Sequence, residues 1–542
     1  MAFSNKALSL RRLFLMTKLI TVKKFAAPLL IICALLITFQ SCKKKRSDEA
    51  TFFFKKTHNK IYQDYSPEAF TLVLKKVLKE QKNGLSHADV ITDFYKKNNY
   101  QPVLVMTHLF NNDLLTASEY YLKADEHGLN PAMFNADQLR GLVYKFYDKQ
   151  KIKNINTAYQ EIAELEVAAA NSLIAYSNAL QFGVVNPKNI YHRYFLATKQ
   201  PDSSAMLKVF RIEDMRAYLD SIQPKSPQYL ALQKAWNEKY VAPGKSAEEC
   251  RRMLQVNLER LRWRNKPFED KYVIVNIPDF SLNVIDSGGR SVLKMKVCVG
   301  QGRNMDNANT LAAYNDSCKT DKPNDHETPL LNSVINYVEV NPVWNIPQSI
   351  ANKEIIKEAA DDRYYLANKG INVYKDGKLV PNPESIDWTT VTKDNSDYDF
   401  KQQPGEDNSL GKIKFLFKNR SNVYLHDTPA KSAFFRKMRA VSHGCVRLGD
   451  PKALALNLFG PGEKYDEIAK DMDDNNPDPS DINLPKKVPV YITYVTCWAD
   501  EDGKLQFRDD VYGQDIVLYE KLQKALHPAN LETRMATNNQ VN

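Results

Sequence analysis

The stretch that decides the fold and its chemistry reads V-Y-L-H-D-T-P at residues 423–429 and S-H-G-C-V-R-L-G-D-P at residues 442–451. It brings one thiol, Cys445, near two imidazoles, with His443 two residues before it and His426 nineteen residues before it. A thiol is a weak nucleophile until it loses its proton, which requires a neighbouring base or positive charge. The pattern therefore predicts an activated cysteine, with either histidine as its base.

The residues around Cys445 favour a rigid site. Residues 423–425 are predicted as a short strand, so His426 lies at a strand end, which gives a base the support it requires. Gly444 allows a sharp turn, so that its N–H and that of Cys445 can point at one spot and hold an oxyanion. The Asp-Pro pair at 450–451 is typical of an N-cap and first helical residue.

Each part of this pattern has a simpler explanation when it is taken alone. A single cysteine is usually a small buried hydrophobic residue, and two nearby histidines can belong to a metal site. A metal needs a third and a fourth ligand, and in this stretch only Asp427 offers itself. We therefore expect no metal and no cofactor. The combination of His426, Gly444 and Cys445 in one stretch is the informative observation.

Strand patterns dominate the second half of the chain. Besides residues 423–425, the predicted strands are 272–277, 280–285, 293–299, 413–417, 488–498 and 504–507. The sequence S-G-G-R at 287–290 is a hairpin signal, and Asp502-Gly503 is a turn signal between the last two strands.

The first half is helical. From about residue 60 to 265 apolar residues recur at spacings of three and four. One long helix is expected to stop at Gly183, and another to start after Ser246, with Glu249 completing a capping box. The fold class is therefore α+β, with a helical N-terminal scaffold domain at 60–265 followed by a β-rich domain at 268–510.

Three further stretches complete the organisation. Residues 348–403 combine a short helix-like run with many polar residues and are expected to form a lid inserted over a β-sheet site. Residues 470–485 are acidic and rich in turn-forming residues, which predicts a surface loop without the spacing of a calcium site. Residues 511–542 are assigned to a C-terminal tail.

The N-terminus, residues 1–42, is typical of a targeting segment. Lys23 and Lys24 precede an apolar run at 25–39, which is short for a membrane span and suits a signal-peptide core. The run ends beside Cys42, as in a loose lipoprotein signal whose acylation would anchor the protein to a membrane. A plain signal peptide or an uncleaved anchor are the alternatives. Each of them places the protein in the periplasm or cell envelope.

The distribution of charge argues against a nucleic-acid partner. Residues 1–46 contain ten Lys or Arg and no acidic residue, within a chain of 542 residues whose formal net charge is +11. The remaining chain has a net charge of +1. It therefore lacks the basic surface that nucleic-acid binding requires.

Four of the seven cysteines lie outside both the targeting segment and the Cys445 motif: Cys250, Cys298, Cys318 and Cys497. They form no C-x-x-C pair, so neither a zinc site nor a redox motif is indicated. A disulfide such as Cys298 to Cys318 is permitted in an oxidising compartment, and buried or idle thiols are the alternative.

The motifs H-D-T-P and S-H-G-C-V-R resemble the signature of the YkuD-type L,D-transpeptidases, and longer segments resemble the YcbB-like subgroup. These segments are N-L-E-R-L-R-W at 257–263, Y-V-I-V-N-I-P-D-F-S-L at 272–282, V-N-P-V-W-N-I-P-Q-S-I at 340–350 and Q-Q-P-G-E-D-N-S-L-G-K-I-K-F at 402–415. The resemblance is dense over the second half and looser over the helical half. It implies a scaffold domain, a YkuD-type catalytic domain and a capping subdomain at 348–403.

The resemblance also implies roles for residues of the motif. Cys445 would be the nucleophile and His426 its base, oriented by the backbone carbonyl beside Asp427.

The residues next to Cys445 would complete the site. Ser442, His443 and Gly444 would shape the cysteine loop and the oxyanion hole. Arg447, together with Ser442 and Asp427, would contact substrate, with a structural salt bridge as the alternative for Arg447.

The implied reaction is acyl transfer between peptidoglycan stem peptides. A Cys445 thioester with diaminopimelate would form with loss of D-Ala, and the amine of a second diaminopimelate would complete a 3→3 cross-link. Water as acceptor would give an L,D-carboxypeptidase, and a protein lysine would give attachment of protein to peptidoglycan. The rivals are a non-catalytic wall-binding scaffold and an unrelated cysteine peptidase, and carbapenems are expected covalent inhibitors. The thiol, base and glycine favour an enzyme, because binding needs no thiol.

The sequence departs from the family pattern in two places. Related chains often carry a small peptidoglycan-binding module before the N-L-E-R-L-R-W segment, whereas the stretch from Lys234 to Arg251 is too short to hold one. Residues 303–327 resemble an extra insertion. We therefore expect the lid and the scaffold to engage the substrate.

Overall fold

The computed structural model describes residues 46–265, 270–302, 326–392, 397–474 and 478–527. The expected targeting segment with Cys42, the expected insertion up to residue 325 and Cys318 therefore lie outside the described residues. Within the part that is described, no helix is long and apolar enough to cross a membrane. The chain divides into two units, residues 1–70 and 71–542, which are described separately.

The described part of the first unit is helical from residue 48, which is earlier than the expected start at residue 60. It contains α2 (Asp48–Thr57) and η1 (Lys60–Asp64), and α3 (Pro67–Gln81) begins within it. Ser47 caps α2 by accepting the Ala50 N–H at 3.0 Å. Phe53 of α2 is buried, and its ring lies 5.5 Å from that of Tyr62.

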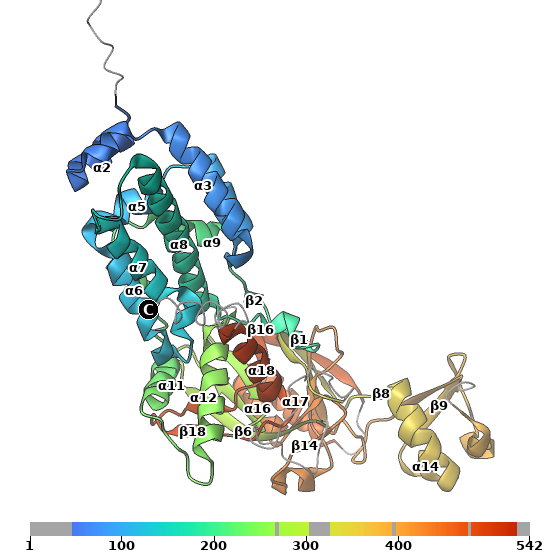
Figure 1. The fold of residues 1–542 in the computed structure, drawn as a ribbon. Helices are drawn as coiled ribbons and strands as arrows, with labels where there is room; N and C mark the ends of the chain where they lie inside the picture. The colour runs from blue at the N-terminus through green and yellow to red at the C-terminus, as the bar shows by residue number, and fades with distance from the viewer. Residues whose placement is uncertain (1–45, 266–269, 303–325, 393–396, 475–477, 528–542) are drawn as a thin grey trace, which may run out of the picture. The chain divides into compact units, whose positions relative to one another are not determined.

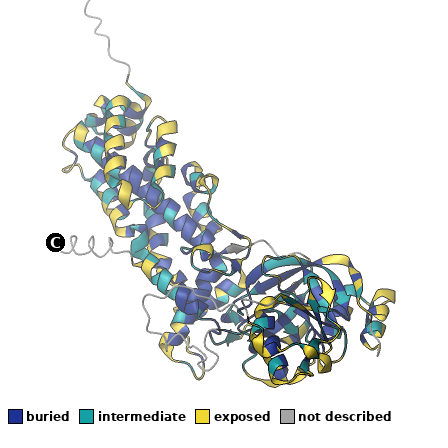
Figure 2. Cartoon of the chain, turned by 90° about the vertical axis from the view of Figure 1, so that its right-hand side faces the viewer, coloured by how far each residue is buried: buried dark blue, intermediate teal, exposed yellow. Residues whose placement is uncertain are grey.

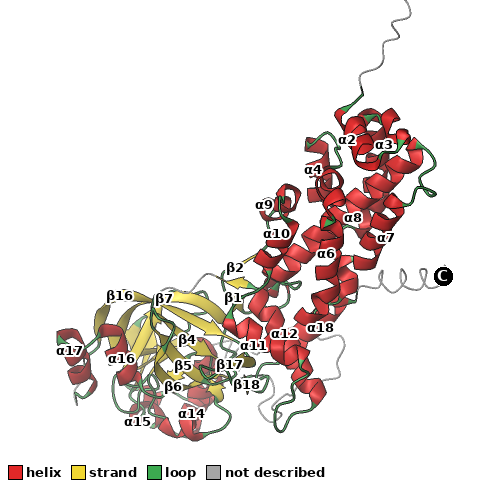
Figure 3. Cartoon of the chain, turned by 90° about the vertical axis from the view of Figure 1, so that its left-hand side faces the viewer, coloured by secondary structure: helices red, strands yellow, loops and turns green. Residues whose placement is uncertain are grey.

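Helices make up the first part of the second unit (Figure 3). The α-helices are α4 (Ala88–Lys97), α5 (Val103–His108), α6 (Asp113–Leu122), α7 (Ala136–Tyr147), α8 (Ile155–Phe182), α9 (Ser203–Leu207), α10 (Met215–Ile222), α11 (Pro227–Asn237) and α12 (Ala247–Arg262). The short helices are η2 (Lys82–Gly84), η3 (Leu109–Asn111), η4 (Lys123–His127), η5 (Pro131–Phe134), η6 (Pro187–Asn189) and η7 (Lys208–Arg211).

Two helix boundaries agree with the local sequence signals. The long helix α8 ends at Gly183, whose φ of 79° suits a glycine at a helix end. Helix α12 begins where Ser246 accepts the Glu249 N–H at 3.1 Å. Most of α8 and α12 is buried, and buried residues run through the helices and the sheet in Figure 2.

The β-rich half is built on a ten-stranded sheet whose strand path closes on itself. Its strands are β1 (Tyr194–Phe195), β4 (Tyr272–Asn276), β5 (Ser281–Ile285), β6 (Ser291–Gly300), β7 (Leu330–Val340), β12 (Ile413–Phe417), β13 (Leu425–His426), β14 (Ala440–Ser442), β15 (Val446–Leu448) and β16 (Ser480–Thr493). The order is β1-β7-β12-β13-β15-β6-β5-β4-β16, β14 pairs with β6, and β16 pairs back to β7. The closed path has the character of a barrel with a buried interior.

The remaining elements of this half surround the sheet. They are β2 (Thr198–Lys199), β3 (Arg264–Asn265), η12 (Lys431–Phe435), α16 (Pro451–Phe459), α17 (Glu463–Met472), β17 (Cys497–Ala499), β18 (Leu505–Phe507) and α18 (Gln514–Leu526). As the Asp-Pro signal predicts, Asp450 caps α16 by accepting the Ala453 N–H at 2.9 Å.

The expected lid is a folded subdomain with its own core. It contains β8 (Trp344–Ile346), α13 (Gln348–Ile350), η9 (Ala351–Ile355), α14 (Ile356–Asp361), α15 (Tyr365–Asn368), β9 (Ile371–Lys375), β10 (Lys378–Leu379), η10 (Pro383–Ser385), η11 (Trp388–Thr390) and β11 (Tyr398–Gln402). Four strands pair in the order β10-β9-β11-β8, and β8, β9 and α14 mark this subdomain in Figure 1. Trp388 and Phe400 are among the buried residues between this sheet and its helices. The α+β class with an inserted subdomain is therefore confirmed.

Two expectations about the organisation are wrong in detail. Residues 511–527 are not a tail, because α18 buries Leu518 and Leu522 and lies beside α12 (Figure 1). Residues 480–485 belong to β16, because pairing with β7 overrides their loop-like composition. The expected change from helices to strands near residues 264–268 lies between α12, which ends at Arg262, and β4, which begins at Tyr272.

Candidate active site

His426 lies on strand β13 between two neighbouring strands. It stands opposite Lys414 of β12 in an antiparallel pair and opposite Arg447 of β15 in a parallel pair. Its side chain is buried. A strand of two residues is thus fixed from both sides, which gives the imidazole a rigid support.

Cys445 directly precedes β15 and is partly exposed. In the parallel pair Leu425 stands opposite Val446, and the Val446 N–H donates to the Tyr424 carbonyl at 3.1 Å. If the same register is continued by one residue toward the N-terminus of both strands, Cys445 lies opposite Tyr424. Because side chains alternate along strands, Cys445 and His426 project from the same face of neighbouring strands. The pairing of this thiol with this imidazole requires that arrangement.

The backbone orients the His426 ring. Its Nδ1 lies 2.5 Å from the carbonyl oxygen of Asp427. A carbonyl oxygen can only accept a hydrogen bond, so Nδ1 carries the hydrogen and Nε2 keeps the lone pair. Burial lowers the pKa of His426 to about 3, and the positive charge of Arg447 acts in the same direction. The ring is therefore neutral near pH 7 and can accept a proton at Nε2.

The thiol of Cys445 is also neutral at rest. Burial raises the pKa of Cys445 to about 11, against the lowering effect of hydrogen bonds from Tyr424 and of the charges on Arg447 and Lys414. The thiolate forms efficiently only when a base takes the proton.

Tyr424 is a site residue that the sequence analysis did not single out. Both its backbone and its side chain hydrogen-bond to Cys445, and its ring lies 5.6 Å from that of His426. Burial raises the pKa of Tyr424 and keeps its hydroxyl protonated. Its position two residues before His426 on a predicted strand is the signal that could have placed it on the same face.

Ser442 holds the turn before Cys445. Its Oγ donates to the Cys445 carbonyl at 2.5 Å and accepts the Gly444 N–H at 3.2 Å. Gly444 has a φ of 119°, which requires glycine. The sequence predicted an oxyanion hole with the N–H groups of Gly444 and Cys445 as its two donors. In the structure the Gly444 N–H donates to Ser442 Oγ instead, so the predicted pair of free donors is not formed. Ser442 itself is buried and serves the turn, which differs from its expected substrate contact.

Thr328 and Tyr512 support this turn from distant parts of the sequence. The Thr328 hydroxyl donates to the Gly444 carbonyl at 2.8 Å and accepts the Gly300 N–H at 2.8 Å. The Tyr512 hydroxyl donates to the Gly300 carbonyl at 2.7 Å and accepts the Thr328 N–H at 3.2 Å. Neither Thr328 nor Tyr512 was expected at the site. Tyr512 lies in the expected C-terminal tail, and Thr328 is far from the Cys445 motif in the sequence.

His443 points toward the capping subdomain. Its Nε2 lies 2.5 Å from Oε1 of Glu354 on η9, and its ring lies 4.7 Å from that of His326. The structure therefore joins His443 to the capping subdomain, a contact that its expected role in the cysteine loop did not include.

Arg447 lies on the same face as Cys445 and His426, half-buried between β13 and β6. Its Nε is buried and has no hydrogen-bond partner among the described residues. Burial lowers the pKa of Arg447, although a guanidinium remains charged at neutral pH.

Asp427 contacts His426 through its backbone carbonyl, and its side chain has other partners. Its buried carboxylate accepts the Lys412 N–H at 3.0 Å and pairs with Lys431 at 2.5 Å. A Cβ at Gly411 would lie 2.4 Å from the Asp427 carboxyl carbon, so the carboxylate is tightly enclosed. Both carboxylate oxygens of Asp427 thus have structural partners, and the expected substrate contact of Asp427 stays a prediction. The carbonyl contact to His426 is present, as the resemblance implied.

The remaining cysteines form no recognisable site. Cys250, Cys298 and Cys497 are buried free thiols, and a pairing with Cys318 lies outside the described residues. In the described ranges, no cluster of three or more His, Cys, Asp or Glu side chains is placed to hold a metal ion.

Two family models match the chain. Residues 270–461 match the YkuD model, described as an L,D-transpeptidase catalytic domain, and residues 89–235 match a scaffold domain. The chain therefore combines a YkuD L,D-transpeptidase catalytic domain with a scaffold domain, the YcbB-like architecture.

A relative from Haemophilus influenzae carries the provisional name L,D-transpeptidase. It is 28% identical to this chain over 319 residues. The match covers 58% of this chain and 59% of the relative, so the chain spans less than two thirds of that protein's length.

Proposed function

We propose that the protein is a peptidoglycan L,D-transpeptidase that makes 3→3 cross-links between diaminopimelate residues through a thioester on Cys445. The observation that carries the proposal is the placement of Cys445 and His426 on one face of neighbouring strands, with His426 Nδ1 bonded to a carbonyl. The matched catalytic domain supports the substrate class.

In the first half-reaction the His426 Nε2 accepts the proton of the Cys445 thiol. The sulfur attacks the carbonyl that joins diaminopimelate to the terminal D-Ala of a stem tetrapeptide. The tetrahedral oxyanion is held by the Cys445 N–H. As the C–N bond breaks, the imidazolium returns the proton to the D-Ala amine, leaving a thioester and a neutral base.

In the second half-reaction the side-chain amine of another diaminopimelate attacks the thioester. His426 takes a proton from the attacking nitrogen, an amide bond forms, and the C–S bond breaks. The proton then returns to the sulfur, so that thiol and base regain their starting states. Arg447 is well placed to hold a carboxylate of the stem peptide, because its buried Nε lacks a protein partner among the described residues.

The same acyl-enzyme could take other acceptors. Attack by water would make the protein an L,D-carboxypeptidase, and attack by a protein lysine would attach that protein to the wall. The capping subdomain contacts the cysteine loop through Glu354 and His443. Exclusion of water by this subdomain would favour the amine.

The proposal places the protein in the periplasm or cell envelope, where peptidoglycan is made. The N-terminal segment supports this location, and acylation of Cys42 would add a membrane anchor. Metabolic labelling with a palmitate analogue, compared with a Cys42→Ala variant, tests the anchor. Label that persists in the variant would contradict it.

The enzyme proposal is tested by muropeptide analysis after incubation of the purified protein with disaccharide-tetrapeptide. We expect release of D-Ala and a 3→3 dimer, and neither product with Cys445→Ala. Turnover by the Cys445→Ala variant would end the proposal. Exposure to a carbapenem provides a second test, because the proposed site should form an adduct on the Cys445 peptide.

A further inference from the structure

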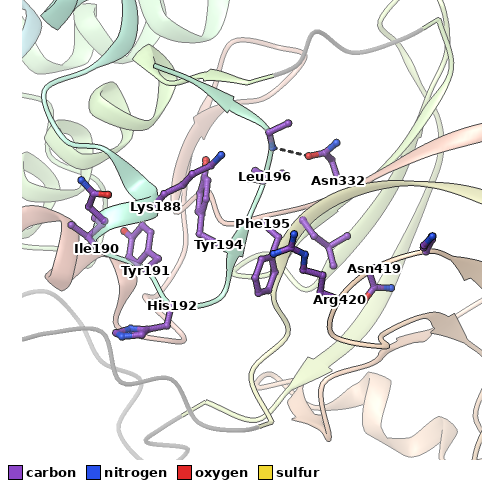
Figure 4. Close-up of a pocket in the computed structure, with 14 residues that line it drawn as sticks. Lys188, Ile190, Tyr191, His192, Tyr194, Phe195, Leu196, Asn332, Asn419 and Arg420 are labelled. Atoms are coloured by element: carbon purple, nitrogen blue, oxygen red, sulfur yellow. Dashed lines mark hydrogen bonds between the residues drawn. The ribbon is translucent and has the colours of Figure 1, made fainter. Parts of the chain in front are cut away.

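A pocket of about 670 Å³ lies where the helical half joins the catalytic sheet. Its described lining residues are Leu331 and Asn332 at the start of β7, together with residues of two further segments of the chain (Figure 4). One segment, residues 188–197, follows α8 and includes β1. The other, residues 418–420, follows β12. The pocket is called the β1–β12 notch below.

The strand pairing explains why the notch exists. On one side β7 is covered by β16, whose register runs from Leu331 to Val340. On its other side β1 pairs at Leu330–Leu331 and β12 pairs at residues 335–340. Strands β1 and β12 therefore pair with different stretches of the same edge of β7. Residues 332–334 lie between these two stretches and face neither strand.

Side chains of β7 fix both rims of the notch. Asn332 Oδ1 accepts the Ala197 N–H at 2.8 Å, as drawn in Figure 4. The Ser333 hydroxyl donates to the Lys418 carbonyl at 2.6 Å. The notch is thus a fixed feature of the sheet edge.

The notch is positively charged and includes an exposed phenylalanine ring. Lys188, Lys418 and Arg420 are exposed, and no Asp or Glu occurs among its described lining residues. Phe195 is 39% exposed and offers an apolar face. Asn189 adds an amide that can donate or accept hydrogen bonds. This chemistry fits a polymer that carries carboxylates, amides and rings with apolar faces.

The notch is connected to the Cys445 turn through the start of β7. Thr328, whose hydroxyl donates to the Gly444 carbonyl, lies four residues before Asn332. Four extended residues span at most about 13 Å. A stem tetrapeptide has a similar extended length, so it is long enough to span the separation between Thr328 and Asn332.

We infer that the β1–β12 notch binds a carboxylate-bearing segment of peptidoglycan and holds it beside Cys445. This inference rests on the proposed function, which supplies the polymer. The notch would anchor the strand in a chain whose α11–α12 connection, residues 238–246, is too short for a wall-binding module. Charge complementarity favours peptidoglycan, because its stem peptides carry free carboxylates.

Sedimentation with insoluble, diaminopimelate-containing peptidoglycan tests the inference, with Cys445→Ala present in every protein to prevent turnover. The notch variant carries Lys418→Glu and Arg420→Glu. Its matched control carries Lys149→Glu and Lys151→Glu, two exposed lysines after α7, so both proteins change net charge equally. We expect the notch variant to bind about tenfold more weakly and the control to bind like the parent.

A second variant tests whether binding depends on the shape and apolar surface of the notch as well as on its charge. Phe195→Ala leaves the net charge unchanged, and we expect it to weaken binding about threefold through loss of the apolar face. Equal thermal melting of all variants shows that the fold is intact. Peptidoglycan whose carboxylates have been converted to amides should bind the parent as weakly as the notch variant binds the native polymer.

Equal binding by the notch variant and the control would overturn the inference. So would a notch effect confined to vesicles of phosphatidylglycerol, because it would assign the cations to a lipid surface. Release of D-Ala from soluble tetrapeptide by the protein with intact Cys445 is measured separately. Release without notch-dependent binding overturns this inference alone, whereas notch-dependent binding without release contradicts the proposed enzyme function.

Discussion

At the scale of single residues, the thiol of Cys445 and the imidazole of His426 are both uncharged near pH 7. Burial raises the pKa of Cys445 to about 11 and lowers the pKa of His426 to about 3. Both shifts oppose a resting pair of thiolate and imidazolium. Proton transfer must therefore accompany attack on the substrate, which limits the reaction of the thiol with unrelated electrophiles.

This resting state predicts how alkylation depends on pH. The thiolate fraction of Cys445 should rise about tenfold per pH unit from pH 6 to 9, because its raised pKa lies above this range. The rate of iodoacetamide labelling, followed by mass spectrometry of the Cys445 peptide, measures it. Labelling that reaches a plateau below pH 7 would instead indicate a preformed ion pair.

The two histidines of the motif should differ in their effect on turnover. We expect His426→Ala to slow D-Ala release by roughly 10² or more, because the variant removes the general base. His443→Ala should have a much smaller effect, since His443 contacts Glu354. Initial rates with disaccharide-tetrapeptide measure both variants. A larger loss with His443→Ala would assign the base to His443.

At the scale of elements, the turn before Cys445 depends on contacts from three separate segments. Thr328 precedes β7, Gly300 ends β6, and Tyr512 precedes α18. The Tyr512 hydroxyl joins the other two through one donated and one accepted hydrogen bond. The geometry of the turn is therefore coupled to the packing of the C-terminal helix.

Tyr512→Phe should lower the free energy of unfolding by about 1–3 kcal/mol, because it leaves buried groups of Gly300 and Thr328 without their partner. It should also slow turnover by loosening the turn. Urea denaturation and initial rates measure the two effects. Tyr147→Phe, which removes a hydroxyl from a half-exposed ring that donates to Leu109, is the matched control. A loss in the control as large as that in Tyr512→Phe would contradict the assigned role.

The sequence correctly predicted those helix ends and turns whose conformation depends on a few neighbouring residues. Gly183 ends α8, Ser246 begins α12, and the turn at 287–290 joins β5 to β6, because caps and turns depend on a few neighbouring residues. The strand from Ser480 was missed, since its pairing with β7 comes from residues far away in sequence.

The site shows the same limit. The motif predicts that His426 pairs with Cys445, but it cannot show that Gly411 packs closely against the Asp427 carboxylate. Nor can it show that Tyr512 reaches Gly300, 212 residues away. Both facts depend on tertiary packing.

At the scale of the whole molecule, α12 links the helical half to the catalytic half. Arg260 of α12 lies 2.5 Å from Asp515 of α18, and both side chains are buried. Asp515 also accepts the Thr496 hydroxyl at 2.6 Å. These buried contacts hold α18 against α12, so the segment after residue 510 is not a tail. They also contribute to the packing of residues 71–542 into one compact unit.

Asp515→Asn should destabilise the protein by about 1–3 kcal/mol, because it removes the 2.5 Å ion pair with buried Arg260 and leaves Asp510 as the carboxylate that still acts on this guanidinium. The midpoint of urea denaturation measures this loss. Glu238→Ala breaks the exposed Lys234–Glu238 pair and is expected to cost less than about 1 kcal/mol. Similar losses in the two variants would show that α18 does not depend on this pair.

In the proposed reaction Cys445 carries the acyl group. Acid quenching of the protein during turnover of disaccharide-tetrapeptide, followed by digestion and mass spectrometry, tests it most directly. We expect the Cys445 peptide to gain the muropeptide mass less the terminal D-Ala, and we expect no adduct in the Cys445→Ala variant. An adduct on another residue, or continued D-Ala release without Cys445, would contradict the account.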